Sequence, residues 1–264
     1  MRSTLNGVAV DECAWHSVAL TNYGHFTSLL VRERAVQGLD LHLQRLAAAT
    51  HELFGTSLDL EHVRAWMRDL VAEADGWHSM RVTVFSREFS RERPADSCAA
   101  DVLISAASIE TSVPQPLSVA TVSYQREAPQ VKHVGTFGLF RQKRLAQLRG
   151  FDDALFVDRR GAISEGSVWN IGFLEDDGIV WPEAANLDGV SQRLLQCGLV
   201  ELGIRSTRRH IDRSDLATFR GAFFTNSVRC VVPLRRIDDI DYAVDPDDLK
   251  ILQQALDTQP WQAL

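Results

Sequence analysis

Lys132 and Glu165 are the residues whose surroundings most favour chemistry. Lys132 stands in "APQVKHVGTFGLF", where a loop is expected to pass into a helix. A lysine amine in such a place can form a Schiff base once burial or neighbouring positive charge deprotonates part of it. Glu165 opens "EGSVWNIGFL", and the glycine and serine that follow leave room beside its carboxylate. A carboxylate in that position can pair with the protonated nitrogen of a flat heterocycle.

Each of these two residues also has an ordinary interpretation. An isolated lysine is usually a solvated surface group, and a glutamate at the start of a strand is often exposed. The sequence offers few other amines, because only Lys132, Lys143 and Lys250 are lysines among 28 basic residues. Lys143 falls inside an expected helix and Lys250 near the C-terminus, so both are weaker candidates.

A candidate phosphate site follows in "LDGVSQRLL", where Gly189, Val190 and Ser191 are expected at the start of a helix. Free N–H groups and the helix dipole at such a start attract anions, although an ordinary helix cap is the alternative. In "FFTNSVRCVVPL", Thr225, Asn226 and Ser227 are expected immediately after a strand and offer hydroxyls and an amide for the same anion.

Candidates for a substrate carboxylate are Arg81 and Arg87 in "MRVTVFSR". If the whole segment is a strand, alternation places both arginines on one face. Tyr23 and His25, in the N-terminal loop, are candidates for lining the pocket. The alternatives are exposed arginines on a half-buried strand and a tyrosine that packs in the core.

The first half of the chain mixes short strands and helices. Strands are expected in "NGVAVD", on both sides of the charged turn in "HFTSLLVRERAVQ", in "MRVTVFSR" and in "DVLISAA". Asp40 is a candidate N-cap for a helix that ends at Gly55, and a second helix is expected from about Leu60 to Ala74. The linker-like "SIETSVPQPLS" suggests a boundary between domains at residues 1–111 and 117–264.

The second half begins with the strand "SVATVSY" and a helix from about Thr136 to Arg149 that Gly150 ends. A hairpin is expected in "DALFVDRRGAISEGSVWNIGFL", followed by strands "GIVWP", "STRRHI" and "GAFFTNS". Helices are expected after "LDGVS", around Leu216 and near Leu249 to Leu256. This order lacks the regular alternation of a doubly wound parallel sheet, so the expected class is α+β in two domains.

Composition narrows the function. The 264 residues are 45% hydrophobic and 24% charged, as in an ordinary globular protein. A net charge of −7 gives no electrostatic basis for binding nucleic acid or an anionic membrane. We find no signal-like or membrane-spanning run and expect a cytoplasmic protein that acts on small molecules without a metal ion. The scattered Cys13, Cys98, Cys197 and Cys230 are expected to be free thiols.

These motifs, in this order, resemble the class IV aminotransferases, the fold-type IV pyridoxal phosphate enzymes. That group includes branched-chain and D-amino acid aminotransferases and 4-amino-4-deoxychorismate lyase. The segment "GFDDALFVDRRGAISEGSVWNIGFL" is similar to the family's run of strand, turn, Glu-Gly-Ser and Asn, and "LHLQRL" resembles the helix that supplies an arginine, here Arg45. The resemblance extends from the N-terminal "NG" to Pro233.

The resemblance implies a D-amino acid aminotransferase-like fold with a small N-terminal α/β domain and a larger C-terminal pseudo-barrel domain. It implies pyridoxal 5′-phosphate on Lys132, a ring nitrogen bonded to Glu165, and a phosphate held by Arg45, Val190, Ser191 and Ser227. Lys132 would also move the Cα proton of the substrate. It further implies a homodimer that acts on an amino acid and a 2-oxo acid.

Several positions depart from the family pattern. Asp188 replaces the usual proline before the phosphate-binding glycine, Gln192 stands where an arginine is common, and Gly172 stands where a larger residue is usual. The N-terminal "TNYGHFTSLLV" is shorter than usual, and "TNSVR" is closer to the lyases, whereas "GTFGLFRQKRL" is not. Three functions therefore stay open: an aminotransferase, a lyase of the aminodeoxychorismate type, and a cofactor-binding protein without turnover.

Overall fold

The computed structural model describes residues 1–73, 75–110 and 114–264. The chain forms two compact units. The first contains residues 1–111, together with Val131–Gly135 and Trp261–Leu264, and the second contains residues 112–130 and 136–260. The expected division at 1–111 and 117–264 did not anticipate that these two later segments group with the N-terminal part. The expected linker includes residues 111–113, and the expected helix end at Ala74 also lies outside the described residues.

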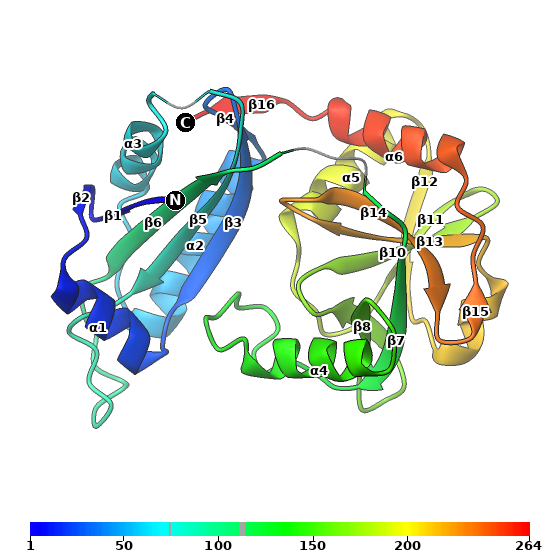
Figure 1. Ribbon diagram of the computed structural model, residues 1–264, viewed down its shortest axis with the longest axis horizontal. Coiled ribbons are helices and arrows are strands. Elements are labelled where there is room, and N and C mark those ends of the chain that lie inside the picture. Colours follow the sequence, from blue (N-terminus) through cyan, green and yellow to red (C-terminus); the bar gives the residue numbers. More distant parts are fainter. Residues whose placement is uncertain (74, 111–113) are drawn as a thin grey trace. The chain divides into compact units, whose positions relative to one another are not determined.

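The first unit is built on an antiparallel sheet of seven strands in the order β16-β4-β3-β5-β6-β1-β2 (Figure 1). Its strands are β1 (Arg2–Leu5), β2 (Val8–Ala9), β3 (His25–Arg32), β4 (Ala35–Gln37), β5 (Trp77–Phe85), β6 (Asp101–Ser108) and β16 (Trp261–Ala263). The long strands β3, β5 and β6 form its centre, where alternation of side chains gives one continuous apolar face.

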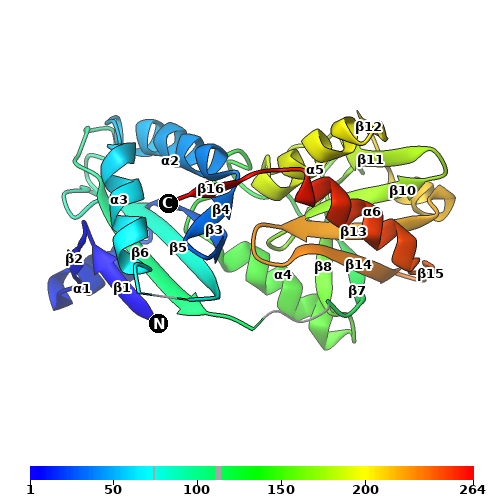
Figure 2. The same ribbon diagram turned by 90° about the horizontal axis from the view of Figure 1, so that it is seen from above.

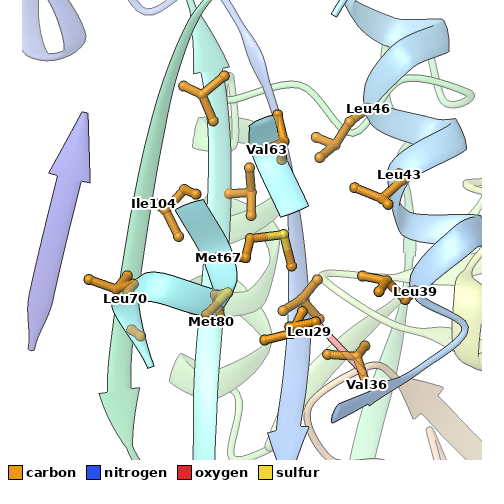
Figure 3. Close-up of a cluster of buried hydrophobic side chains, with 14 of the residues drawn as sticks. Leu29, Val36, Leu39, Leu43, Leu46, Val63, Met67, Leu70, Met80 and Ile104 are labelled. Carbon is orange, nitrogen blue, oxygen red and sulfur yellow. The ribbon is translucent and has the colours of Figure 1, made fainter. Parts of the chain in front are cut away.

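Helices α2 (Leu39–Phe54) and α3 (Leu60–Leu70) cover that apolar face. In Figure 3, Leu39, Leu43 and Leu46 of α2 point towards the sheet and α3, where Leu29 and Met67 lie. The spacing of these leucines is that of one helix face. Helix α1 (Glu12–Thr21) is a third helix of this unit.

The second unit contains a sheet of nine strands that closes on itself. Strands β10, β13, β14, β7, β8 and β9 follow one another, and β9 pairs back with β10, so these six form a barrel. The strands are β7 (Leu117–Ser123), β8 (Asp153–Val157), β9 (Ile163–Gly166), β10 (Asn170–Glu175), β11 (Gly178–Pro182), β12 (Arg205–Arg209), β13 (Gly221–Asn226), β14 (Cys230–Ile237) and β15 (Ile240–Asp241). Closure pairs each of the six barrel strands on both sides.

Four helical segments accompany the barrel: α4 (Phe137–Leu148), α5 (Val190–Glu201), the 3₁₀ helix η1 (Arg213–Thr218) and α6 (Pro246–Asp257). Helices α5 and α6 lie side by side (Figure 2). A Cβ at Gly198 of α5 would lie 1.9 Å from the carbonyl oxygen of Ala255 in α6, so this close packing requires glycine.

Most expected elements are present, and the differences have local causes. Helix α1 was not predicted, because Trp15 and Leu20 are exposed and the segment has no single apolar stripe. Helix α2 begins two residues before its expected start, with Gly38 at the N-cap; the Asp40 carboxylate instead accepts a hydrogen bond from Gln262 at 2.7 Å. Strand β14 was missed because Pro233 interrupts its apolar run, a pattern that usually argues against a strand.

Two further findings concern membrane spans and thiols. None of the helices in the described part of the chain is both long enough and apolar enough to span a membrane. Cys98, Cys197 and Cys230 are free thiols, whereas the side chain of Cys13 is outside the described residues.

Candidate active site

Lys132 is held in place by main-chain bonds to the start of β3. The Phe26 amide donates to the Lys132 carbonyl at 2.9 Å, and the Val134 amide donates to the Gly24 carbonyl at the same distance. An isolated antiparallel bridge pairs His25 with His133 between these bonds. The lysine therefore lies just before α4, where the sequence placed it, and its backbone is anchored to the first unit.

The ring of Phe26 connects Lys132 with Arg81. The Lys132 amine lies 4.9 Å from the centre of this ring, and the Arg81 guanidinium lies 3.5 Å from the same centre. Both contacts have the geometry of cation–π pairs. Arg81, predicted as a carboxylate-binding residue, is thus placed in the neighbourhood of Lys132.

Arg45 is oriented by a small buried network on the same unit. Its guanidinium donates to the Thr27 hydroxyl and lies 3.3 Å from His42 Nδ1, which is itself 2.7 Å from the Thr27 hydroxyl. Arginine cannot accept a hydrogen bond, so His42 Nδ1 is the acceptor and the imidazole is neutral. Burial, then the charges of Arg45 and Lys132, lowers the pKa of His42 well below its usual value.

Tyr23 and His25, also predicted to line the substrate pocket, contact side chains of the first unit. Tyr23 stacks on Phe89 at 4.3 Å and packs against the core of the first unit, which favours the core alternative. His25 is buried, and its Nε2 lies 3.0 Å from the Thr50 hydroxyl.

The expected position of Arg87 on the strand is wrong. β5 ends at Phe85, and Arg87 follows in a turn where it forms an ion pair with Asp101 at 2.8 Å. The Arg87 amide also donates to the Asp101 carboxylate at 2.9 Å. The turn, and not strand alternation, therefore sets the direction of this side chain.

In the second unit, Glu165 lies at the end of β9 and is only 6% exposed. Its carboxylate accepts a hydrogen bond from the Leu187 amide at 3.2 Å and lies 3.3 Å from Nε of Arg126. The alternative of a solvated glutamate is therefore excluded. A buried carboxylate needs such partners, because they compensate the cost of removing its charge from water.

Arg126 is a residue that sequence reasoning missed. Its side chain is 5% exposed, and its guanidinium also donates to the Pro129 carbonyl. Its position just upstream of Lys132 in "YQREAPQVK" was a signal, but the large excess of arginine over lysine in the chain made one more arginine unremarkable.

Gly166 of "EGS" and Gly189 of "DG" each permit a close approach near the Glu165 carboxylate. A Cβ at Gly166 would lie 1.9 Å from the indole ring of Trp169, and a Cβ at Gly189 would lie 2.0 Å from Oδ1 of Asn170. The Asn170 amide also donates to the Leu187 carbonyl at 2.8 Å. Asn170 therefore clamps the segment whose amide reaches Glu165, and only glycine permits the approach.

The start of α5 has the donors that a phosphate requires. Gly189 is its N-cap, and no side chain of the described residues caps the helix, so its first amide groups are not used by a cap. The Ser191 and Ser227 hydroxyls lie 3.5 Å apart. In the described residues the buried Thr225 hydroxyl of the neighbouring strand end has no hydrogen-bond partner. Asn226 instead shapes the turn, since its side-chain oxygen accepts from the amides of Val228 and Arg229.

Asp188 and Gln192, which depart from the family pattern, differ in their exposure to solvent. The Asp188 side chain is 60% exposed and lies 3.8 Å from the Arg193 guanidinium, so its charge is both solvated and partly paired. Gln192, in contrast, is 1% exposed. Solvent and Arg193 therefore offset the negative charge that Asp188 brings to the helix start.

The geometry of each unit fits a part of pyridoxal phosphate. The second unit provides a buried carboxylate for a ring nitrogen and a helix start with hydroxyl groups for a phosphate, while the first unit provides an anchored lysine and an oriented arginine. Glu165, Gly189, Val190, Ser191, Asn226 and Ser227 belong to the second unit; Lys132, Arg45, Tyr23, His25, Arg81 and Arg87 belong to the first.

Comparison with known proteins gives a consistent family. The profile "Amino-transferase class IV" matches residues 24–237. A branched-chain-amino-acid aminotransferase of Pseudomonas aeruginosa is 28% identical over 136 residues, which are 49% of this chain and 44% of that protein. The chain thus spans less than half the length of the curated relatives that it matches.

Solved structures with the same fold cover nearly the whole chain. A branched-chain aminotransferase of Thermoproteus uzoniensis with norvaline covers 97% of this chain and 93% of its own, with a TM-score of 0.86 and 22% identity. The branched-chain aminotransferase of Escherichia coli covers 95% and 91%, with a TM-score of 0.82 and 20% identity. A Legionella pneumophila structure assigned to the 4-amino-4-deoxychorismate lyases covers 92% and 93%, with a TM-score of 0.80 and 16% identity. At these identities the likeness shows the fold alone.

The ion pair between Arg126 and Glu165 predicts strong coupling in a double-mutant cycle. Arg126→Met leaves a buried carboxylate without its cation, which costs about 3–5 kcal/mol of unfolding free energy. Adding Glu165→Gln removes that charge, so we expect the double variant to recover most of the loss. Urea denaturation of the wild type, both single variants and the double variant measures this coupling. Additive effects of the two substitutions would contradict it.

The buried His25 predicts a loss of stability in mild acid. Burial, then the charge of Arg45, lowers its pKa from 6.5 to about 4. The unfolded chain therefore binds this proton more readily, and stability falls as the pH drops through that window.

We expect His25→Gln to make this pH dependence shallower, by about 1.4 kcal/mol per pH unit for one group. His42 keeps part of the slope, because its pKa is lowered as well. Denaturation curves across the window measure the slope, and His62→Gln, at an exposed histidine, is the matched control. Parallel pH profiles for the wild type and His25→Gln would refute the assignment.

Proposed function

Because the chain belongs to the class IV aminotransferase family, we propose that it is a pyridoxal phosphate-dependent aminotransferase that moves an amino group between an amino acid and a 2-oxo acid. The observation that carries the proposal is the buried Glu165 carboxylate, held by Arg126 and the Leu187 amide. An ion pair with only a structural role would need no uncapped helix start beside it. A phosphorylated heterocycle needs a carboxylate for its ring nitrogen and a helix start for its phosphate.

Each unit contributes candidate residues to this proposal. Glu165 would accept a hydrogen bond from the protonated ring nitrogen, while the start of α5 with Ser191 and Ser227 would bind the phosphate. Arg45, oriented by Thr27 and His42, would add a charge-assisted bond to that phosphate. When bound, pyridoxal phosphate supplies a reactive carbonyl carbon and a conjugated ring that accepts electrons from the substrate Cα.

The protein side chains then have separate roles. The Lys132 amine would anchor the cofactor and, once displaced by the incoming amine, would take and return the proton at Cα. Arg126 would keep the Glu165 carboxylate in place for the ring nitrogen. Arg81, which shares the Phe26 ring with Lys132, would bind the substrate carboxylate.

The lyase remains the second candidate function. Asn226 ends β13 and Ser227 follows it, a pair that resembles the lyases more than the branched-chain enzymes. A lyase of the aminodeoxychorismate type releases pyruvate and needs no oxo-acid acceptor, so the two activities are separable in solution.

Absorbance spectra with pyridoxal phosphate test the proposal. We expect a visible band from cofactor bound to the protein, and we expect an amino acid, taken from a panel of D and L forms, to convert it to the amine form. Lys132→Ala should abolish the band, whereas Lys250→Ala, at an exposed lysine of α6, should retain it. Glu165→Gln should retain binding but lower turnover at least about tenfold, since a hydrogen bond to a charged group contributes roughly 1.5–3 kcal/mol.

Other outcomes would contradict the aminotransferase. Pyruvate released from aminodeoxychorismate without an acceptor would favour the lyase. A band that no donor changes, with no pyruvate, would indicate a binding protein without turnover. Absence of any band would exclude the role of Lys132.

A further inference from the structure

A hollow lined by arginines lies on the barrel unit, away from the residues discussed so far. It has a volume of about 500 Å³, and its lining includes Arg149, Arg213 and Arg236, the ring of Phe151 and the buried Thr121. All of these residues belong to the second unit. We infer that this hollow binds the phosphate group of a small phosphorylated molecule, at a site separate from the cofactor.

The floor of the hollow is ordered by Thr121 and Asp238. Thr121 is 4% exposed, and its amide donates to the Asp238 carboxylate at 2.8 Å while its hydroxyl donates to the other carboxylate oxygen. The same hydroxyl accepts a hydrogen bond from the Arg213 guanidinium. Thr121 thus compensates part of the Asp238 charge, and its hydroxyl positions the Arg213 guanidinium at the base of the hollow.

The wall of the hollow places two further guanidinium groups around one ring. Those of Arg149 and Arg236 lie 5.5 Å and 5.9 Å from the centre of the Phe151 ring. Arg236 Nε is also 3.9 Å from the Asp241 carboxylate. These contacts hold the arginines near one another even though the groups are exposed.

The pairing of the guanidinium groups, and not the net charge of the hollow, favours an anion. Of the three arginines, only Arg236 has a carboxylate within 4 Å, as far as the described residues show. Asp241 lies beside Arg236, and the Asp238 carboxylate accepts hydrogen bonds from the amide and the hydroxyl of Thr121. Arg149 and Arg213 are therefore the guanidinium groups that we expect to meet an anion. Guanidinium groups match phosphate oxygens in geometry as well as charge.

The hollow is distinct from the donors at the start of α5. Ser227 lies in the turn before β14, which begins at Cys230, whereas Asp238 directly follows the end of β14 at Ile237. At about 3.3 Å per residue, the ends of this strand are roughly 20 Å apart. The volume of the hollow also lies in the range of small-molecule sites, so it accommodates more than an inorganic phosphate ion.

Calorimetric titration of the full chain with inorganic pyrophosphate tests this inference. The protein is loaded with pyridoxal phosphate, freed of excess cofactor, and titrated at constant ionic strength. We expect one saturable event per chain that weakens at least tenfold in Arg149→Gln/Arg213→Gln. The matched control is Arg159→Gln/Arg160→Gln, at two exposed arginines in the turn between β8 and β9, and should bind as the wild type does.

Further variants keep the test decisive. Arg149→Gln alone removes an exposed guanidinium that contacts the Phe151 ring, so it should fold normally and still weaken binding several-fold. Malonate replaces the phosphate probe by a dicarboxylate and should bind more weakly. Absent saturation, unchanged binding in the arginine variants, or equal binding of malonate would overturn the inference. The same pyrophosphate titration without pyridoxal phosphate separates binding in the hollow from the proposed catalytic function.

Discussion

The candidate site of the barrel unit is organised around a buried ion pair, that between Glu165 and Arg126. Both side chains are at least nine-tenths buried, and each would be costly to bury alone. The pair is therefore stable only while the segments around it hold their positions. Asn170 clamps the segment before α5, and the Leu187 amide in that segment adds a donor to the carboxylate.

The close packing around this ion pair also positions the groups that we expect to bind a ligand. Gly166 lets Trp169 fold over the end of β9, and Gly189 lets Asn170 reach the start of α5. These close approaches place a buried carboxylate and an uncapped helix start on neighbouring segments of one unit, as far as the described residues show. In the first unit a comparable arrangement of neutral His42 and Thr27 orients Arg45, while the pairing of residues 24–26 with 132–134 anchors the lysine.

Sequence alone could identify the residues that have a characteristic motif, but not those that only support them. Lys132 and Glu165 became candidates because lysines are scarce and because Glu-Gly-Ser is a recognisable run. Arg126 and His42 were not, since their roles come from contacts between segments distant in the chain. The α+β class and most strands followed from alternation, whereas α1 and β14 lacked the periodic signal that such reasoning requires.

The protonation state of the bound ring nitrogen would reveal whether Glu165 binds that nitrogen. Nitrogen-15 NMR of ring-labelled pyridoxal phosphate bound to the full chain would be recorded at a pH where the free ring nitrogen has lost its proton. We expect a protonated nitrogen in the wild type and an unprotonated one in Glu165→Gln. An unprotonated nitrogen in the wild type, or a shift that Glu165→Gln leaves unchanged, would contradict the role assigned to Glu165.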